Sequence, residues 1–213
     1  IYNMDYLPHN RGFDLFYGFP NGIQDYWEWN LMRNDVNEPH DGRYLTDVLN
    51  REAIKFIEKN KNSPFFLFLS HHAPHSPLQA PDSLFNKYRK RLPGIYHDNV
   101  AAIYGMIEAM DVGLGWVFDK LEELGLKQNT IIVFTSDNGA YIKGSYKRYT
   151  AGYSGNKDMV LEQGIRVPAI VSWPGVIEKD QVITIPVHGT DWLPTLFNRS
   201  EEHTSELQSL LII

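Results

Sequence analysis

The sequence predicts an α/β domain with a mostly parallel central sheet. Two short apolar runs, residues 65–69 and 131–135, are each bounded by chain breakers, as is typical of strands buried on both faces. A long helical pattern over residues 99–124 lies between them. A strand, a helix and a strand in this order predict a βαβ unit, and such units build parallel sheets covered by helices.

The other elements follow from local patterns. A helix is predicted over residues 46–60, where apolar side chains recur at helical spacing and Thr46 or Asp47 is expected to cap the start. Further strands are predicted over residues 167–173 and 182–187, both of which are apolar and β-branched. The breaks between these elements are rich in Pro, Gly, Asn and Ser, which favour turns.

The long helix carries three informative residues. Gly113 and Gly115 weaken its middle, and this predicts close packing against a neighbour. Asp111 falls on the apolar stripe and is expected to be a buried carboxylate with a structural role. Gly125 is placed to end the helix.

Composition excludes several classes of protein. The chain has 213 residues, 43% of them hydrophobic, which is enough for one domain with a substantial core. Its formal net charge of −6 is a poor basis for binding nucleic acid, which needs a basic face. No run of about 18 apolar residues predicts a membrane span, and the absence of cysteine excludes disulfides and thiolate chemistry in this stretch.

Asp137-Asn138-Gly139 follows the second apolar run directly. Asn-Gly is a strong hairpin signal, but the flanking residues do not alternate as hairpin strands do. A carboxylate and an amide oxygen are hard ligands that suit Ca²⁺ or Mg²⁺, although two ligands do not fill a calcium shell. From the pattern alone, a turn and a metal site are equally good interpretations.

Other polar residues admit both a chemical and a structural interpretation. Among the histidines of the loop after the first strand, His75 stands between two prolines and could protonate a leaving group, but a hydrogen-bonded loop histidine is the commoner case. Lys157 follows a glycine-bearing loop and could hold an anion, whereas most lysines are simply solvated. The loop with His75 and the loop with Asp137-Asn138 each directly follow a predicted strand, and ligands of parallel α/β sheets gather at the carboxyl ends of strands.

Several segments together resemble the sulfatase family, of the arylsulfatase type. They are RGFDLFYGFPNGIQDYW (11–27), PFFLFLSHHAPHSPLQAP (64–81), FTSDNG (134–139), GNKDMVLEQGIRVPAIVSWPG (155–175) and HGTDWLPTL (188–196). Their order and spacing match over essentially all of residues 1–198. Several motifs in register are far more specific than any one of them.

This resemblance implies an alkaline-phosphatase-like α/β/α fold and hydrolysis of sulfate esters. It also implies a site with one calcium ion, for which magnesium is an alternative, and a formylglycine nucleophile. Transferred residue by residue, Asp137 and Asn138 correspond to metal ligands, Lys157 to a lysine that binds sulfate oxygens, and His75 to the histidine that contacts the sulfate and protonates the departing alcohol. The expected substrate is a sulfated small molecule or glycan, and the expected compartment is periplasmic or extracellular.

The sequence also departs from the family pattern. The formylglycine motif, a pair of acidic metal ligands and a Lys-x-His motif are not in this chain, so residues 1–198 are expected to be a partial catalytic domain that is inactive alone and binds calcium weakly. Gln163 stands where Gly is usual, and Ser154 where a basic residue is frequent. Residues 199–213 resemble the translation of a sequencing adaptor and are expected to be a non-native tail.

Two alternative functions stay open at this point. A phosphodiesterase or phosphonate hydrolase would share the fold, although relatives with two metals often have Asp-His where this chain has Asp137-Asn138. A non-catalytic glycan-binding relative would share the fold without the nucleophile. Oligomeric state is left undetermined.

Overall fold

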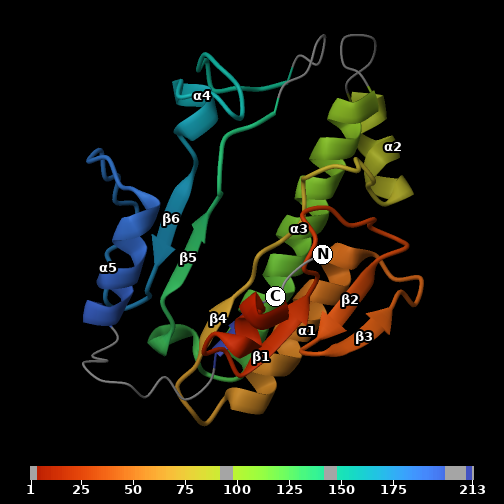
Figure 1. Ribbon diagram of the computed structural model, residues 1–213. Coiled ribbons are helices and arrows are strands. Elements are labelled where there is room, and N and C mark those ends of the chain that lie inside the picture. Colours follow the sequence, from red (N-terminus) through yellow and green to blue (C-terminus); the bar gives the residue numbers. More distant parts are fainter. Residues whose placement is uncertain (1–3, 92–97, 142–147, 200–209, 213) are drawn as a thin grey trace.

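Two sheets and two long helices dominate the computed structural model, which describes residues 4–91, 98–141, 148–199 and 210–212 (Figure 1). The helices are α1 (Leu45–Asn60), α2 (Asp82–Arg91), α3 (Asp98–Glu123), α4 (Glu162–Ile165) and α5 (Trp192–Arg199), with 3₁₀ turns η1 (Met4–Tyr6), η2 (Pro8–Asn10), η3 (Lys127–Asn129) and η4 (Gly189–Asp191). The strands are β1 (Leu15–Gly18), β2 (Asn30–Arg33), β3 (Val36–Pro39), β4 (Phe66–Phe68), β5 (Ile132–Thr135), β6 (Ala169–Ser172) and β7 (Leu210–Ile212). The fold is therefore α/β, as predicted.

The larger sheet has the strand order β3-β2-β1-β7-β4. Strands β1, β2 and β3 form antiparallel pairs, whereas β7 lies parallel to both β1 and β4. β7 belongs to residues 199–213, and the non-native origin of that tail stays a prediction.

The second sheet pairs β5 with β6 in antiparallel fashion. This differs from the expected βαβ unit, because β4 and β5 lie in separate sheets instead of one parallel sheet. The βαβ pattern gives the order of elements along the chain but not which strand becomes the neighbour of which. The helix between the two strands, α3, is present as predicted.

Helices lie on both sides of strand β5 in the small sheet, whereas the residues of β6 are exposed. Successive side chains of a strand point to opposite faces. Ile132 of β5 packs against the main core, to which Val117 and Leu121 of α3 belong, whereas Val133 lines an apolar pocket with Trp192 of α5. This is a local α/β/α arrangement, with α5 and α3 on opposite sides of β5 (Figure 1).

The main core lies between α1 and α3. At the crossing of the two helices, a Cβ on Gly113 would lie 2.0 Å from Asn50 Nδ2 of α1, so the predicted close packing at Gly113 is confirmed. Gly115 does not share this role, because a Cβ there would meet nothing within 4 Å. Gly125, with φ of +70°, follows the end of α3 as predicted.

Three further sequence-based expectations are wrong. Asp111 is exposed, because the buried face of α3 runs through Met106, Ala109 and Gly113 and leaves Asp111 outside it. The start of α1 has no side-chain cap, and the Leu45 N–H instead donates to the Tyr26 carbonyl at 2.8 Å. Residues 182–187 form no strand, since no described residue pairs with them, and their apolar side chains are exposed.

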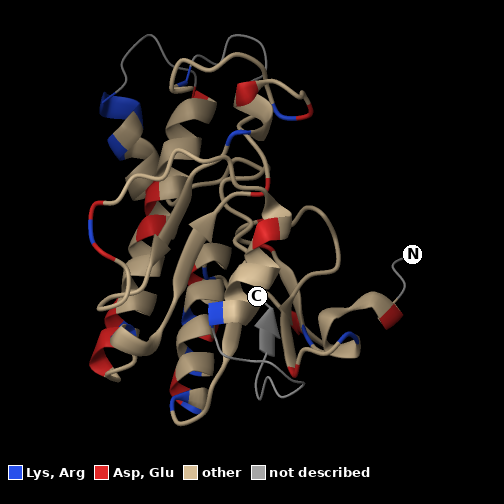
Figure 2. Cartoon of the chain, turned by 90° about the vertical axis from the view of Figure 1, so that its left-hand side faces the viewer, with Lys and Arg blue, Asp and Glu red and all other residues tan. Residues whose placement is uncertain are grey.

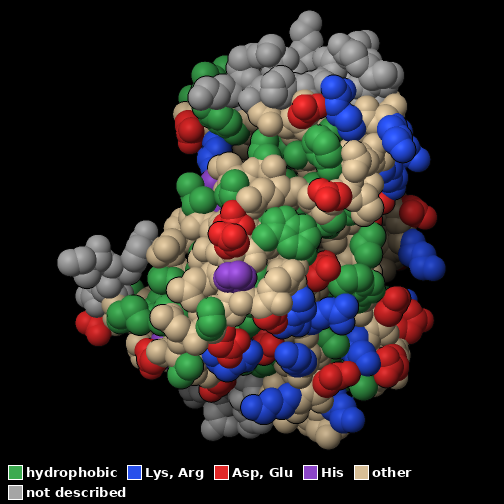
Figure 3. All heavy atoms as spheres, turned by 90° about the vertical axis from the view of Figure 1, so that its right-hand side faces the viewer, with side chains coloured by type: hydrophobic (Ala, Val, Ile, Leu, Met, Phe, Trp, Pro, Cys, Tyr) green, Lys and Arg blue, Asp and Glu red, His purple; other side chains and the backbone are tan. Residues whose placement is uncertain are grey.

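α3 is also long and apolar enough to cross a bilayer by length and composition alone, so the expectation that no segment spans a membrane stays a prediction. Half of the most apolar 18-residue stretch of α3 is buried inside the protein. α3 packs against α1 and α2, as the core helix of a folded domain does. In Figure 2 and Figure 3, Lys and Arg are interleaved with Asp and Glu over the helices and loops.

Candidate active site

Asp137 and Asn138 lie shortly after the end of β5, where the chain reaches the surface. The Asp137 side chain is exposed and that of Asn138 is half-buried. The Ser136 hydroxyl donates a hydrogen bond to the Asn138 carbonyl at 3.1 Å, within this turn. The partner strand β6 begins only at Ala169, so this turn is not a hairpin and that interpretation of the Asn-Gly pair is excluded.

Gly139 fixes this turn against the segment that precedes β6. Its N–H donates to the Gly164 carbonyl at 2.9 Å. A Cβ at position 139 would lie 1.7 Å from the Gln163 carbonyl oxygen, which is far inside the contact limit. Only glycine therefore allows the two backbones to approach this closely.

Lys157 is attached to the same turn by its own backbone. Its N–H donates to the Ala140 carbonyl at 3.0 Å, and the Gln163 N–H donates to the Ser154 carbonyl at 2.9 Å. Backbone groups make both bonds, so the unusual residues at 154 and 163 do not prevent the loop from closing. The structure thus brings the Lys157 loop beside Asp137 and Asn138.

His75 lies in a separate loop after β4. Its N–H donates to the His72 carbonyl at 2.8 Å, and the Tyr26 hydroxyl donates to the His75 carbonyl at 3.0 Å. The exposed ring has Nδ1 at 2.9 Å from the Ser76 carbonyl. A carbonyl only accepts, so Nδ1 carries the proton and Nε2 is the atom that can exchange a proton with a ligand.

His72 supports His75 from behind and was missed by sequence reasoning. The two ring centroids are 5.3 Å apart, and His72 is also stacked on Tyr26 at 5.0 Å. Burial, and then the nearby His75, lower the pKa of His72, and its Nε2 accepts the Gln24 N–H at 3.3 Å. His72 is therefore fixed by its ring contacts and this hydrogen bond, and its role is structural. The three histidines in one loop were visible in the sequence, but their different burial was not.

The donor set at the end of β5 fits a hard cation only in part. A carboxylate and an amide oxygen side by side are ligands that Ca²⁺ and Mg²⁺ accept. Within the described ranges, however, no group of three or more His, Cys, Asp or Glu side chains could hold a metal ion. Asp137 and Asn138 can contribute to a metal site, and the remaining ligands have to come from elsewhere.

The structure brings together three of the four predicted site residues. Asp137, Asn138 and Lys157 share one backbone-bonded cluster. His75 makes no hydrogen bond to them among the residues that the structure describes, and its loop belongs to the region between β4 and α2 (Figure 1). Their roles in binding and catalysis stay predictions.

Comparison of the sequence with known proteins identifies the same family that these motifs resemble. The family model described as Sulfatase matches residues 1–200. The chain belongs to the sulfatase family. Human Arylsulfatase D is 37% identical to this sulfatase chain over 178 residues, with 80% of the chain and 28% of the relative covered. Human Steryl-sulfatase is 36% identical, with 78% of the chain and 28% of the relative covered.

Solved structures give the same result in three dimensions. The crystal structure of Ps i-CgsB in complex with k-i-k-neocarrahexaose superposes with a TM-score of 0.86 at 29% sequence identity, covering 98% of the sulfatase chain and 51% of that protein. The putative sulfatase yidJ from Bacteroides fragilis gives 0.73 at 25% identity, covering 95% and 48%. The alkaline-phosphatase-like α/β fold is confirmed. The chain spans about half of these solved proteins and less than a third of the two human relatives.

Proposed function

We propose that this chain forms part of the catalytic domain of a sulfuric ester hydrolase. The observation that carries the proposal is the backbone junction of Lys157 with Ala140 and of Gly139 with Gly164. These backbone bonds hold the Lys157 loop beside the turn that carries Asp137 and Asn138, in a chain whose family hydrolyses sulfate esters.

The proposed roles follow from the chemistry of each side chain. Asp137 and Asn138 would hold a divalent hard cation, calcium or magnesium, which when bound polarises sulfate oxygens as a Lewis acid. Lys157 supplies a compact positive charge to the sulfate oxygens, so that charge developing during the reaction is met by a fixed partner. The nucleophile, expected to be a formylglycine, would come from outside this chain.

His75 is suited to the leaving group. Because the Ser76 carbonyl holds its Nδ1–H, a protonated ring has one proton left to give, the one on Nε2. The same hydrogen bond and the Tyr26 contact to its backbone restrict where the ring points. Protonation of the departing alcohol oxygen by Nε2 is the general-acid step that His75 would perform.

The proposed substrates are sulfated glycans or sulfated small molecules. The name of Ps i-CgsB describes a complex with a neocarrahexaose, and the human relatives are named for aryl and steryl sulfates. Both classes present the same sulfate ester to the cluster at the end of β5.

Sulfate release by the full-length parent protein tests the proposal. We expect Lys157→Ala to lower kcat/KM for sulfate esters by about 100-fold, a typical loss when one stabilising group is removed. Lys179→Ala is the matched control, because Lys179 is an exposed lysine of the loop after β6, and it should retain activity.

The alternatives give different results in the same assay. Cleavage of phosphate diesters or phosphonates in preference to sulfate esters would favour the phosphodiesterase alternative. Glycan binding with no turnover of either ester would favour a non-catalytic relative. A Lys157→Ala protein as active as the parent would overturn the role of Lys157.

A further inference from the structure

Arg148 is a half-buried cation that the sulfatase chemistry above does not use. Within the described part of the chain it makes no ion pair and no hydrogen bond. Burial lowers its pKa, and the Tyr104 phenol only partly offsets this. Burying a charged group without a counter-charge is costly, so such a group usually meets an oppositely charged partner.

The neighbouring Tyr149 has an aromatic ring with no structural task. Its backbone N–H donates to the Tyr104 hydroxyl of α3 at 3.2 Å, and this bond fixes the segment without using the Tyr149 side chain. The Tyr149 side chain is 83% exposed. An exposed, anchored aromatic ring offers a flat face for an apolar or sugar-like surface.

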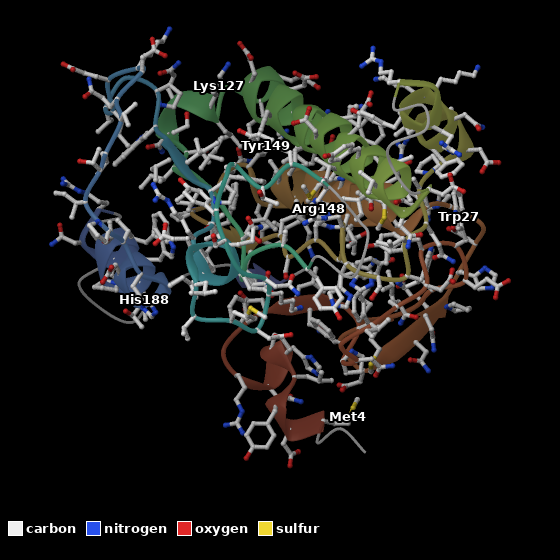
Figure 4. The ribbon with its side chains drawn as sticks, turned by 90° about the horizontal axis from the view of Figure 1, so that it is seen from above. Met4, Trp27, Lys127, Arg148, Tyr149 and His188 are labelled. Carbon is white, nitrogen blue, oxygen red and sulfur yellow. The ribbon has the colours of Figure 1, made fainter. Side chains whose placement is uncertain are left out.

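Both residues lie on the segment that leads into Lys157. Farther along, Ser154 is bonded to Gln163 and Lys157 to Ala140, so this segment is held at its α3 end and at its site end. Figure 1 shows it crossing the top of the molecule between α4 and the N-terminal half of α3. In Figure 4, which looks down on that end, Arg148 lies near the middle of the view and Tyr149 lies beside α3.

We propose that Arg148 and Tyr149 form a second binding subsite, in which Arg148 binds an anionic substituent of a glycan other than the sulfate that is cleaved, and Tyr149 packs against a sugar ring. The guanidinium is planar and presents paired N–H donors that match a sulfate or a carboxylate. The substrate class is then a glycan with at least two anionic groups. This inference rests on the proposed function and narrows its substrate.

Kinetics of the full-length protein with three matched oligosaccharides test the subsite. One carries a single sulfate on a neutral backbone, one carries two sulfates, and one carries one sulfate and one uronate carboxylate. We expect Arg148→Ala to lower kcat/KM for a dianionic oligosaccharide relative to the monosulfated one by about tenfold or more, the loss of a charge-assisted hydrogen bond. The two dianionic arms show whether Arg148 prefers sulfate or carboxylate.

Variants of similar chemistry serve as controls. Arg11→Ala should leave the relative rates as in the parent, because Arg11 lies over the Tyr6 ring in the N-terminal region and belongs to another part of the chain than Arg148. Tyr149→Ala should weaken oligosaccharide binding by roughly 2- to 10-fold while Tyr149→Phe keeps it, since stacking needs the ring and not the hydroxyl.

Calorimetric binding of the same oligosaccharides separates the two proposals. If the parent protein releases no sulfate but Arg148→Ala still weakens binding of dianionic oligosaccharides, the proposed function fails and the subsite stands. If Arg148→Ala weakens binding and turnover of all three oligosaccharides equally, or of none, the subsite is overturned whatever the activity.

Discussion

Gly139 is the residue on which the geometry of the candidate site most depends. Its position beside the Gln163 carbonyl allows the Asp137-Asn138 turn to bond to Gly164. From the sequence pattern alone, the same Asn-Gly pair is consistent with either a hairpin or a metal site. The deciding fact, the close approach of a backbone segment some 25 residues later, is nonlocal and could not be seen in the pattern.

Gly139→Ala is therefore expected to destabilise the chain by about 1–3 kcal/mol, because the added methyl group overpacks against backbone atoms that cannot move as side chains do. Urea unfolding would measure this. Gly115→Ala is the matched control, because a Cβ there meets nothing and alanine favours the helix by about 0.5–1 kcal/mol. Equal midpoints for Gly139→Ala and the parent chain would show that the two segments are not in close contact.

The candidate residues identified from the family resemblance differ from the one identified from the structure in how they can be recognised. Asp137, Asn138, Lys157 and His75 stand in motifs that can be quoted from the sequence. Arg148 stands in no such motif, and its proposed role comes from its partial burial without an ion pair among the described residues, which only coordinates reveal. Sequence analysis thus identifies residues that belong to family motifs, and it misses residues whose role depends on their three-dimensional surroundings.

At the scale of elements, long periodic segments were predicted well and strand pairing was not. α1 and α3 begin and end within about one residue of their predicted bounds, because a helix satisfies its backbone within itself. A strand needs a partner, so apolar runs predicted β4, β5 and β6 correctly but not the pairing of β5 with β6. Residues 182–187 show the same limit, since an apolar pattern without a neighbour gives no strand.

Contact between α1 and the loop after β4 makes stability depend on pH. His71 Nε2 lies 3.2 Å from Asn50 Oδ1 and donates to it, while its Nδ1 is buried without a hydrogen-bond partner among the described residues. Protonation would place a charge on that isolated atom. Burial accordingly lowers the pKa of His71 to about 4 from its ordinary value of 6.5.

The sign of the effect follows from where the proton binds. Between pH 6.5 and pH 4 the unfolded chain takes up a proton on His71 that the folded chain does not. The free energy of unfolding should therefore decrease as pH falls through this window, by about 3 kcal/mol for this histidine, at about 1.4 kcal/mol per pH unit.

Urea titrations of the parent chain and His71→Gln across this range would measure the effect. Glutamine can still donate to Asn50 but does not titrate, so the variant should lose less stability toward pH 4 than the parent. Parallel pH profiles for the two chains would contradict the assignment to His71.

At the scale of the whole molecule, one part of the chain has a well-packed core, whereas another part exposes apolar side chains. The α1–α3 region is densely packed, whereas the C-terminal third exposes many large apolar side chains, among them Val182 and Ile183. Contiguous exposed apolar patches often mark surfaces that pack against other protein. The solved sulfatase and the human relative are about two and about three times as long as this chain, so they contain additional chain that this one lacks.

This architecture predicts that the 213-residue chain binds calcium weakly. Asp137 and Asn138 supply two oxygen donors, and calcium takes six or more, so most of its shell would be water. We expect a Kd for calcium weaker than about 1 mM, outside the range of complete calcium sites, and no release of sulfate from an aryl sulfate.

Calorimetric titration of the chain and of Asp137→Ala would measure the affinity, and the variant should bind no better than the parent chain. The full-length protein should bind calcium far more tightly and lose that affinity with Asp137→Ala, because there the carboxylate is expected to complete the shell of ligands. Micromolar binding by the isolated chain would mean that its own residues already form a full site, and the division of ligands between this chain and the rest of the protein would be wrong.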